Sequence, residues 1–587
     1  MNRTNRGYPL LFPRQNWRHY ALRSLQFAVA LYLLAFFLFP VGFLFLKALQ
    51  NPDGTMGWGI IALLFANPVS WESLQNSLIV ATGAACLAGS LALAAAALFW
   101  KSDIRPSPFM ELCGFLPLFM PAFVLASSLD IIVGGHGGLP AMLQNLLGIS
   151  RANASLLSLT LIEALHYFPF ILIALHLSTR ASSPQAHAMA RLGTSWRRLI
   201  RQVFVPLALP GLAFAMALTF LKVIDDLATP LALGITNMLA PQAYHRIAVY
   251  GAQDPLAALI AAILFITSGL AWFASLGFIR QNVNLFPATF NDNKPPPTSA
   301  SMRGRFFITF LGVVYLGCYA GLILSSLAGV WSHTPLPETY VLTHYLKAFR
   351  FEMSSLYNTL IYCGFAALID ILVALPLAHA IAKAPPHWKQ RLGWLVAGTL
   401  CIPGVTLGIA YLALFRDIQL PLSNLPLDAT GLLLTLAFSI RGLPFALHIC
   451  SLALNSVPAS YIEAARTLGC APAKIVSRIV FPMLRFGLLL AFTLCFSLAA
   501  VDLSLAALLV PNENNAPLAY SIYLHIQSPS GMNVGSALAI ISFALLALIL
   551  FGIIHRLHRR QGSHRPLSPP LFPTHRTTGF AHESSHH

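Results

Sequence analysis

Apolar runs, each long enough to cross a bilayer, recur about twelve times along the chain. In the first half we place these predicted spans near 24–49, 75–100, 110–134, 155–177, 207–235 and 256–280. In the second half we place them near 306–331, 358–382, 393–415, 431–454, 483–510 and 535–556. Each run is roughly 20–25 residues, the length of a transmembrane helix. The pattern predicts an all-α polytopic membrane protein.

Polar segments divide these runs into two sets of six. The basic leader 1–23 and the proline-rich linker 281–305 flank the first predicted domain, 24–280. The second predicted domain, 306–556, is followed by a tail, 557–587, that is rich in His, Arg and Pro and is expected to be disordered. Because both sets begin on the same side, they are expected to form a parallel repeat. Asn76 and Asn358 open matching spans.

Charge placement gives the orientation. The 587 residues are 57% hydrophobic and 9% charged, with a formal net charge of +17. If both termini are cytoplasmic, most Lys and Arg residues fall in cytoplasmic loops and most acidic loop residues fall on the other side. The positive charge is then explained by topology, and no nucleic-acid partner is needed. The first apolar run is too long for a cleavable signal peptide and lacks a cleavage site, so it is predicted to remain as an anchor.

A polar stretch, 455–482, interrupts the apolar pattern before the eleventh span. Its central residues are Glu463, Ala464, Ala465, Gly469 and Pro482. Helix-forming residues lie on both sides of Gly469, which predicts two short helices joined at a glycine that turns the chain. Nothing in this stretch is equipped for catalysis. It suits a helix–turn–helix that another protein binds at the membrane surface.

A second copy, 178–206, precedes the fifth span. Gly193 and Pro206 are separated by the same number of residues as Gly469 and Pro482, and Ala188 matches Ala464. His187 stands where Glu463 stands in the other copy, and Met189 replaces the second alanine. The shape is therefore expected in both halves, whereas the acidic contact is expected only in the second.

The spacing of 455–482 resembles the EAA loop of permease subunits of ATP-binding-cassette (ABC) importers. The resemblance implies a fused, double-length permease of the type I importer fold in the bacterial inner membrane, working by alternating access. It also implies two copies of a cytoplasmic ATPase that carry Mg-ATP, each seated on one loop, and a periplasmic substrate-binding protein. In this family Glu463 would accept from a basic group of the ATPase, the two alanines would permit close approach, Gly469 would supply the turn and Pro482 would mark the entry to the next helix.

Fused permeases of this kind are similar to those of ferric-iron importers, and also to those of thiamine, phosphonate or polyamine systems. The segment Asp-Asp-Leu-Ala-Thr-Pro-Leu, which begins at Asp225, and Asp502 resemble the ferric-iron group most closely. The predicted function is therefore import of a small solute, with ferric iron as the first choice. An ion-driven secondary transporter is the alternative from another class, but such a carrier has no reason to keep the glycine-hinged loop twice.

Motifs for chemistry are sparse in the sequence. It contains no GxxxxGK[ST] and no spaced Cys/His set, and its HExxH match at 582–586 lies in the tail that is expected to be disordered rather than on a helix. We therefore expect no enzyme activity, no metal site and no cofactor in this chain.

Ionisable residues inside predicted spans are the other informative feature, because each costs about 2.5–3.5 kcal/mol at a helix centre and tends to face a cavity or a partner. Asp225 and Asp226 in the fifth span and Asp502 in the eleventh could meet between the halves and line a path for a cation. Alternatively, Lys222 pairs with Asp225 or Asp226 along its own helix, and Asp502 caps locally. The remaining candidates for the path are Glu163, His166 and Arg441.

Overall fold

The structure is a computed structural model, and it describes residues 24, 27–51, 53–101, 120–133, 138–180, 198, 200–280, 302–331, 336–416, 418–419, 426–528 and 530–561. Within these ranges the secondary structure is helical, apart from three isolated bridges. The predicted all-α polytopic class is confirmed. The leader 1–23, residues 281–301 of the predicted linker, and residues 562–587 of the predicted tail lie outside the described residues.

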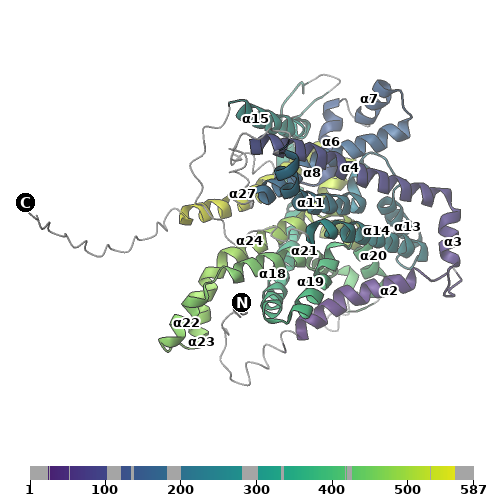
Figure 1. Cartoon of the computed structure of the whole chain (residues 1–587). Coiled ribbons are helices and arrows are strands. Elements are labelled where there is room, and N and C mark those ends of the chain that lie inside the picture. Colours follow the sequence, from purple (N-terminus) through teal and green to yellow (C-terminus); the bar gives the residue numbers. More distant parts are fainter. Residues whose placement is uncertain are drawn as a thin grey trace, which may run out of the picture.

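The first half runs from the N-terminal helix to Arg280 (Figure 1). Its elements in order are η1 Leu34–Leu38, α2 Phe39–Lys47, α3 Gly59–Ala66, α4 Pro68–Lys101, α6 Ala122–Val133, α7 Gly138–Leu147, α8 Arg151–Arg180, η3 Ile200–Phe204, α11 Val205–Asp225, α12 Ala228–Ala232, α13 Leu239–Tyr250 and α14 Pro255–Arg280.

The second half runs from Met302 to Gln561. Its elements in order are α15 Met302–Gly317, α16 Ala320–Leu327, α17 Thr343–Phe351, α18 Met353–Lys383, α19 Pro386–Leu400, α20 Gly404–Phe415, η4 Leu427–Ala429, α21 Leu432–Asn455, α22 Ala459–Thr467, α23 Pro472–Ile475, η5 Val476–Val480, α24 Phe481–Ala500, α25 Leu503–Leu509, η6 Glu513–Asn515, α26 Leu518–Gln527 and α27 Met532–Gln561.

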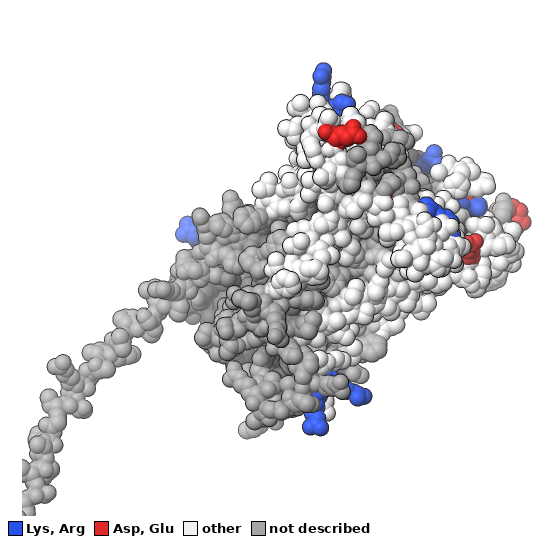
Figure 2. All heavy atoms as spheres, turned by 90° about the horizontal axis from the view of Figure 1, so that it is seen from above, with Lys and Arg blue, Asp and Glu red and all other residues white. Residues whose placement is uncertain are grey.

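Eight of the described helices are long and apolar enough to cross a membrane, or up to ten if each of two bent pairs is one span. The bent pairs are Ala122–Val133 with Gly138–Leu147, at 63°, and His387–Leu400 with Gly404–Phe415, at 93°. Shorter apolar helices cover Gly312–Leu327 and Met532–Leu548. The predicted count of about twelve spans is not confirmed. Among the described residues in Figure 2, the charged side chains lie toward the margins of the face shown, and the white surface between them carries none.

Two of the predicted spans contain a helix break. The predicted span 207–235 ends its helix at Asp225, and 483–510 is interrupted between Ala500 and Leu503. In both places an aspartate carboxylate accepts from backbone N–H groups of the following short helix, which stabilises the new N-terminus. Helix also extends further than predicted at two boundaries: α15 begins at Met302, inside the predicted linker, and α27 continues to Gln561, inside the predicted disordered tail.

The two halves repeat specific local contacts. The Leu239 N–H donates to Ser77 Oγ at 2.9 Å, and the Leu518 N–H donates to Thr359 Oγ1 at 2.7 Å. The amides of Asn76 and Asn358 also donate to matching carbonyls, of Asn237 and Asn514, in the two halves. The π-helical turns η3 and η5 precede α11 and α24, respectively. Both α11 and α24 have a proline in their first turn.

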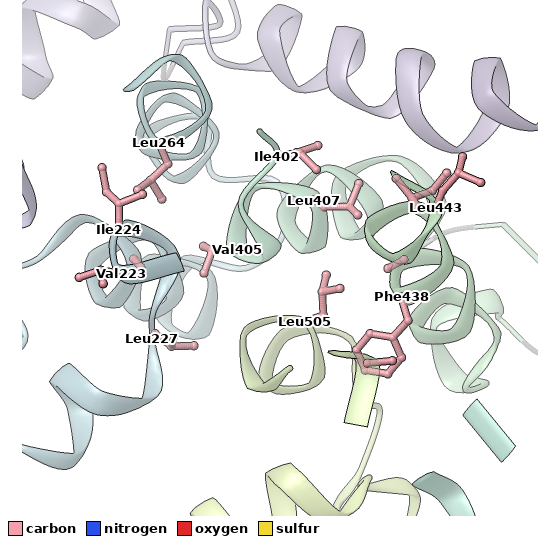
Figure 3. Packing of buried hydrophobic residues seen from close by; sticks show 14 of the residues in the cluster. Val223, Ile224, Leu227, Leu264, Ile402, Val405, Leu407, Phe438, Leu443 and Leu505 are labelled. Atoms are coloured by element: carbon pink, nitrogen blue, oxygen red, sulfur yellow. The ribbon is translucent and has the colours of Figure 1, made fainter. Parts of the chain in front are cut away.

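The helices pack through small residues and one core that both halves share. Ala84, Ala88 and Ala92, one helical turn apart on α4, are fully buried, and α4 packs against both α8 and α11; such small residues let helix backbones approach closely. Figure 3 shows side chains from α11 and α14 of the first half beside those of α20, α21 and α25 of the second. The breaks after α11 and α24 therefore lie in the shared core.

Candidate functional site

The loop 455–482 forms the predicted pair of short helices. Gly469 has φ +74°, a conformation that favours glycine, and the N–H groups of Gly469 and Cys470 donate to the carbonyls of Arg466 and Ala465. These two bonds form a Schellman motif, which ends α22 and starts the turn toward α23. α22 and α23 extend beyond the other helices at one end of the molecule (Figure 1).

One face of this loop packs on its own helices, and the other is exposed. Ile462, Ala465 and Ile475 are buried in a small cluster with the start of α24. Glu463 and Ala464 are exposed. Ala465 therefore supports the loop from inside, which differs from the close approach to a partner that the resemblance implied for it. Leu468, at the tip, is 82% exposed, and sequence reasoning missed it although an apolar residue directly before the glycine was a visible signal.

In the first-half loop, His187, Ala188 and Gly193 lie outside the described residues. Pro206 is described, and it occupies the first turn of α11 as Pro482 occupies the first turn of α24. The predicted asymmetry between His187 and Glu463 stays a prediction.

Arg441 on α21 joins the two halves through a buried ion-pair cluster, the Arg441 bridge. Its Nη2 lies 2.8 Å from Asp225 Oδ2 of the first half, and its Nη1 donates to Asp502 Oδ2 of the second. The Arg441 side chain is 14% exposed, and the two carboxylates are less exposed still. The structure thus brings together three of the predicted path residues.

Each carboxylate of the bridge also binds backbone exposed by a helix break. Asp225 Oδ1 accepts from the Val405 N–H at 3.1 Å, so a first-half side chain caps α20 of the second half. Asp502 Oδ1 accepts from the Leu505 N–H at 3.2 Å and caps its own α25. The Asp225 carbonyl accepts from Ser504 Oγ at 3.0 Å. Backbone N–H groups at the starts of α20 and α25 therefore help to hold the two carboxylates of the bridge in place.

Lys222 does not pair as the local alternative supposed. Among the described residues it forms no ion pair, because Asp225 binds Arg441 and Asp226 caps α12. Its side chain instead helps to line a cavity of about 40 Å³ between α11, α19, α21 and α24, whose polar lining also includes Thr399, Arg441 and Asp502. The bridge thus faces a small open space on one side.

The remaining candidates lie on α8. Glu163 is completely buried, and His166 is 1% exposed with its ring edge-on to Tyr167. Glu163 faces Asp226 and Thr229 rather than the Arg441 bridge. The predicted path residues therefore form two adjacent groups, divided at the Asp225–Asp226 peptide.

Sequence reasoning missed Asp370 on α18. Its carboxyl is buried, and Oδ2 lies against Gly442, where any side chain would collide with it. The signal was a lone acid within the apolar run ALIDILVAL. Of the described residues, no group of three or more His, Cys, Asp and Glu side chains could hold a metal ion.

A second acidic contact lies at the start of α18, outside the long spans. His525 Nε2 lies 2.8 Å from Glu352 Oε1, and Ser355 Oγ donates to Oε2 at 3.1 Å. The hydrogen bond from His525 is the largest cause that lowers the pKa of Glu352 below its ordinary 4.5, against a smaller opposing effect of burial.

A lowered pKa in the folded state stabilises the fold above pH 4.5, and this contribution is lost as the pH falls through the lowered value. We expect Glu352→Gln to lower the melting temperature of the detergent-solubilised protein at pH 7 and to leave it unchanged well below pH 4. Thermal unfolding followed across that range checks the prediction. A difference of constant size at every pH would contradict it.

Comparison with known proteins finds similarity to transport permeases. Residues 354–563 match the family described as binding-protein-dependent transport system inner membrane component. The chain is 23% identical over 492 residues to the ferric transport system permease protein FbpB of Actinobacillus pleuropneumoniae, covering 81% of this chain and 70% of that protein. It is 23% identical over 440 residues to a putative FbpB of Haemophilus influenzae, covering 73% and 68%. The molybdenum transport system permease ModB of Mycobacterium tuberculosis matches 32% of this chain at 23% identity.

Residues 354–563 therefore match an inner-membrane transport component, and the comparisons over most of the chain support a multi-pass permease of the type I ABC importer class. Within that class it is similar to ferric transport permeases over most of its length.

Proposed function

We propose that this permease carries ferric iron, released by a periplasmic binding protein, into the cytoplasm by alternating access driven by two copies of an ATPase. Its similarity to two ferric transport permeases across 81% and 73% of its length carries the choice of substrate. The family description supports a binding protein as partner. Mg-ATP binds to the ATPases, and both termini lie in the cytoplasm.

The exposed face of α22 is the proposed contact with one ATPase. Glu463 on this face is available to accept from a basic group, and Leu468 at the tip is available for an apolar pocket. The corresponding first-half contact, through His187, lacks that charge and is the weaker of the two in this proposal.

α24 links this contact to the Arg441 bridge. The helix covers Phe481–Ala500, so the loop at its start and Asp502 just past its end are about 30 Å apart along one axis. In the proposed cycle, movement of α22 and α23 on the ATPase is transmitted along α24, the bridge between Asp225, Arg441 and Asp502 separates, and the path opens to the periplasm. The separated carboxylates then face the path and attract a cation.

The test is uptake into proteoliposomes that contain the permease, its ATPase and its binding protein. We expect ATP-dependent accumulation of radioactive ferric iron, no accumulation with ADP, and no competition by excess thiamine, polyamine, phosphonate or molybdate. ATP-dependent uptake of one of these solutes without uptake of iron would overturn the choice of substrate while leaving the permease class intact.

A further inference from the structure

Two carboxyl groups, those of Glu163 and Asp226, face each other beside the Arg441 bridge. Glu163 on α8 is 0% exposed, and neither of its carboxyl oxygens has a hydrogen-bond partner. Its carboxyl faces that of Asp226, at the break before α12, and the buried Thr229 hydroxyl, which also lacks a well-aligned partner. Ile162 and Ala228, the neighbours of this contact, pack in one apolar cluster.

Asp226 receives only part of its hydrogen bonding from the backbone. The N–H groups of Ala228 and Thr229 donate to its two oxygens at 3.0 and 3.3 Å. In the described part of the chain, neither Glu163 nor Asp226 forms an ion pair, and no third ligand completes a metal site beside them. Glu163 is completely buried and Asp226 is partly buried, so two negative charges facing each other here repel, and a small cation between them relieves that repulsion.

The second half shows what this position requires. Asp226 and Asp502 are equivalent: each follows the matching helix of its half and caps a short helix through N–H groups up to three residues on. In the second half the capping carboxylate meets the Arg441 guanidinium. In the first half the aligned α8 segment carries His166 at the position of Arg441, and Glu163, one helical turn earlier, lies against the carboxylate of Asp226. The first-half carboxylate thus faces an acid where the second-half carboxylate faces the guanidinium.

We propose that Glu163 and Asp226 form a proton-binding site, in which one proton is shared so that a carboxylic acid O–H of one side chain donates to the carboxylate of the other. One proton both removes the repulsion and supplies the missing hydrogen-bond donor. The negative charge of Asp225 pairs with Arg441. The repulsion between Asp226 and Glu163 is removed by the shared proton, within the first half. The site stands on this contact alone and does not depend on which solute is transported.

Other titratable groups lie near the pair. They are His166 and Tyr167 on α8, Lys222 and Asp225 on α11, Arg441 on α21 and Tyr523 on α26. Arg441 is already bound by two carboxylates, so it does not replace the proton.

Infrared spectroscopy of the purified permease in lipid tests the site without any transport. At neutral pH we expect an absorption of a protonated, buried carboxyl that is lost in Glu163→Gln and also in Asp226→Asn, because the amide N–H then binds the remaining carboxylate and no proton is needed. Asp254→Asn is the matched control, since Asp254 forms an ion pair with Arg246, whose Nε lies 2.5 Å from Asp254 Oδ2. Asp370→Asn separates the contribution of the other buried acid.

The proposal holds if the absorption lost in either amide variant persists in both controls. It is overturned if Glu163→Gln and Asp226→Asn each keep the wild-type carboxyl absorption, or if the absorption disappears only with Asp370→Asn. Using two amide variants keeps the test decisive if one of them fails to fold.

Discussion

Arg441→Met is expected to abolish uptake and to destabilise the permease by about 3–5 kcal/mol, because it leaves the carboxylates of Asp225 and Asp502 buried without their cation. The arginine is the sole cation bound to both carboxylates among the described residues, and it joins helices of the two halves. Chemical denaturation in detergent and ferric uptake in proteoliposomes measure the two effects.

Removing the charges of Asp225 and Asp502 together with that of Arg441 separates the effect on stability from the effect on uptake. The triple variant Arg441→Met, Asp225→Asn, Asp502→Asn removes all three charges, so it should recover most of the lost stability while uptake stays low. Asp502→Asn alone should impair transport more than assembly, since the amide still accepts from the Leu505 N–H. Arg246→Met is the matched control, because the Arg246–Asp254 pair lies within one half of the chain; we expect it to leave uptake intact and to cost less stability than Arg441→Met. Normal uptake in Arg441→Met would contradict a role for the bridge in transport.

Gly469→Val is expected to reduce uptake severely and to weaken co-purification of the ATPase. A side chain at Gly469 meets no atom within 4 Å, so the defect comes from the backbone: φ +74° costs a non-glycine residue about 1–2 kcal/mol, and valine is among the worst residues for it. The turn would relax and the exposed face of α22 would lose its orientation. Glu463→Lys should have a similar effect by reversing the charge at the proposed contact.

Gly148 offers a matched control for the glycine. It also has positive φ, +64°, with nothing within 4 Å, but it lies in a loop predicted on the opposite side of the membrane. Gly148→Val should impose a comparable backbone strain and leave ATPase binding intact. Glu513→Lys, at an exposed acid on that same predicted side, controls for Glu463→Lys. Normal recovery of the ATPase with both Gly469→Val and Glu463→Lys would disprove the assignment of this loop.

The sequence predicted the parts of the fold that depend on local pattern. Apolar runs located α4, α8, α18 and α21, and Gly469 located the turn between α22 and α23. The breaks at Asp226 and Asp502 were missed because the runs stay apolar on both sides, and only the carboxylate caps reveal a new helix start. The end of α27 was missed because a charged sequence was taken for disorder, although helix continues to Gln561.

The candidate site was predicted in its members but not in its pairing. Asp225, Asp502 and Arg441 were singled out as ionisable residues in apolar spans, yet Lys222 was the closer cation in sequence. Which cation binds Asp225 is decided by packing: the end of α11 lies against α20 and α21 of the other half, and no local spacing encodes that contact. Asp370 escaped notice because it has no ionisable neighbour in sequence, and its contact with Gly442 is tertiary.

Hydrogen–deuterium exchange of the assembled permease and ATPase tests most directly the claim that ATP-driven movement of the loop 455–482 opens the Arg441 bridge. The Val405 and Leu505 amides are bound by the bridge carboxylates, so their exchange reports its state. We predict that trapping the complex with ATP accelerates exchange in the peptides that contain these two amides, and that Gly469→Val prevents the change. Equal exchange with and without ATP in the wild-type complex would contradict the account.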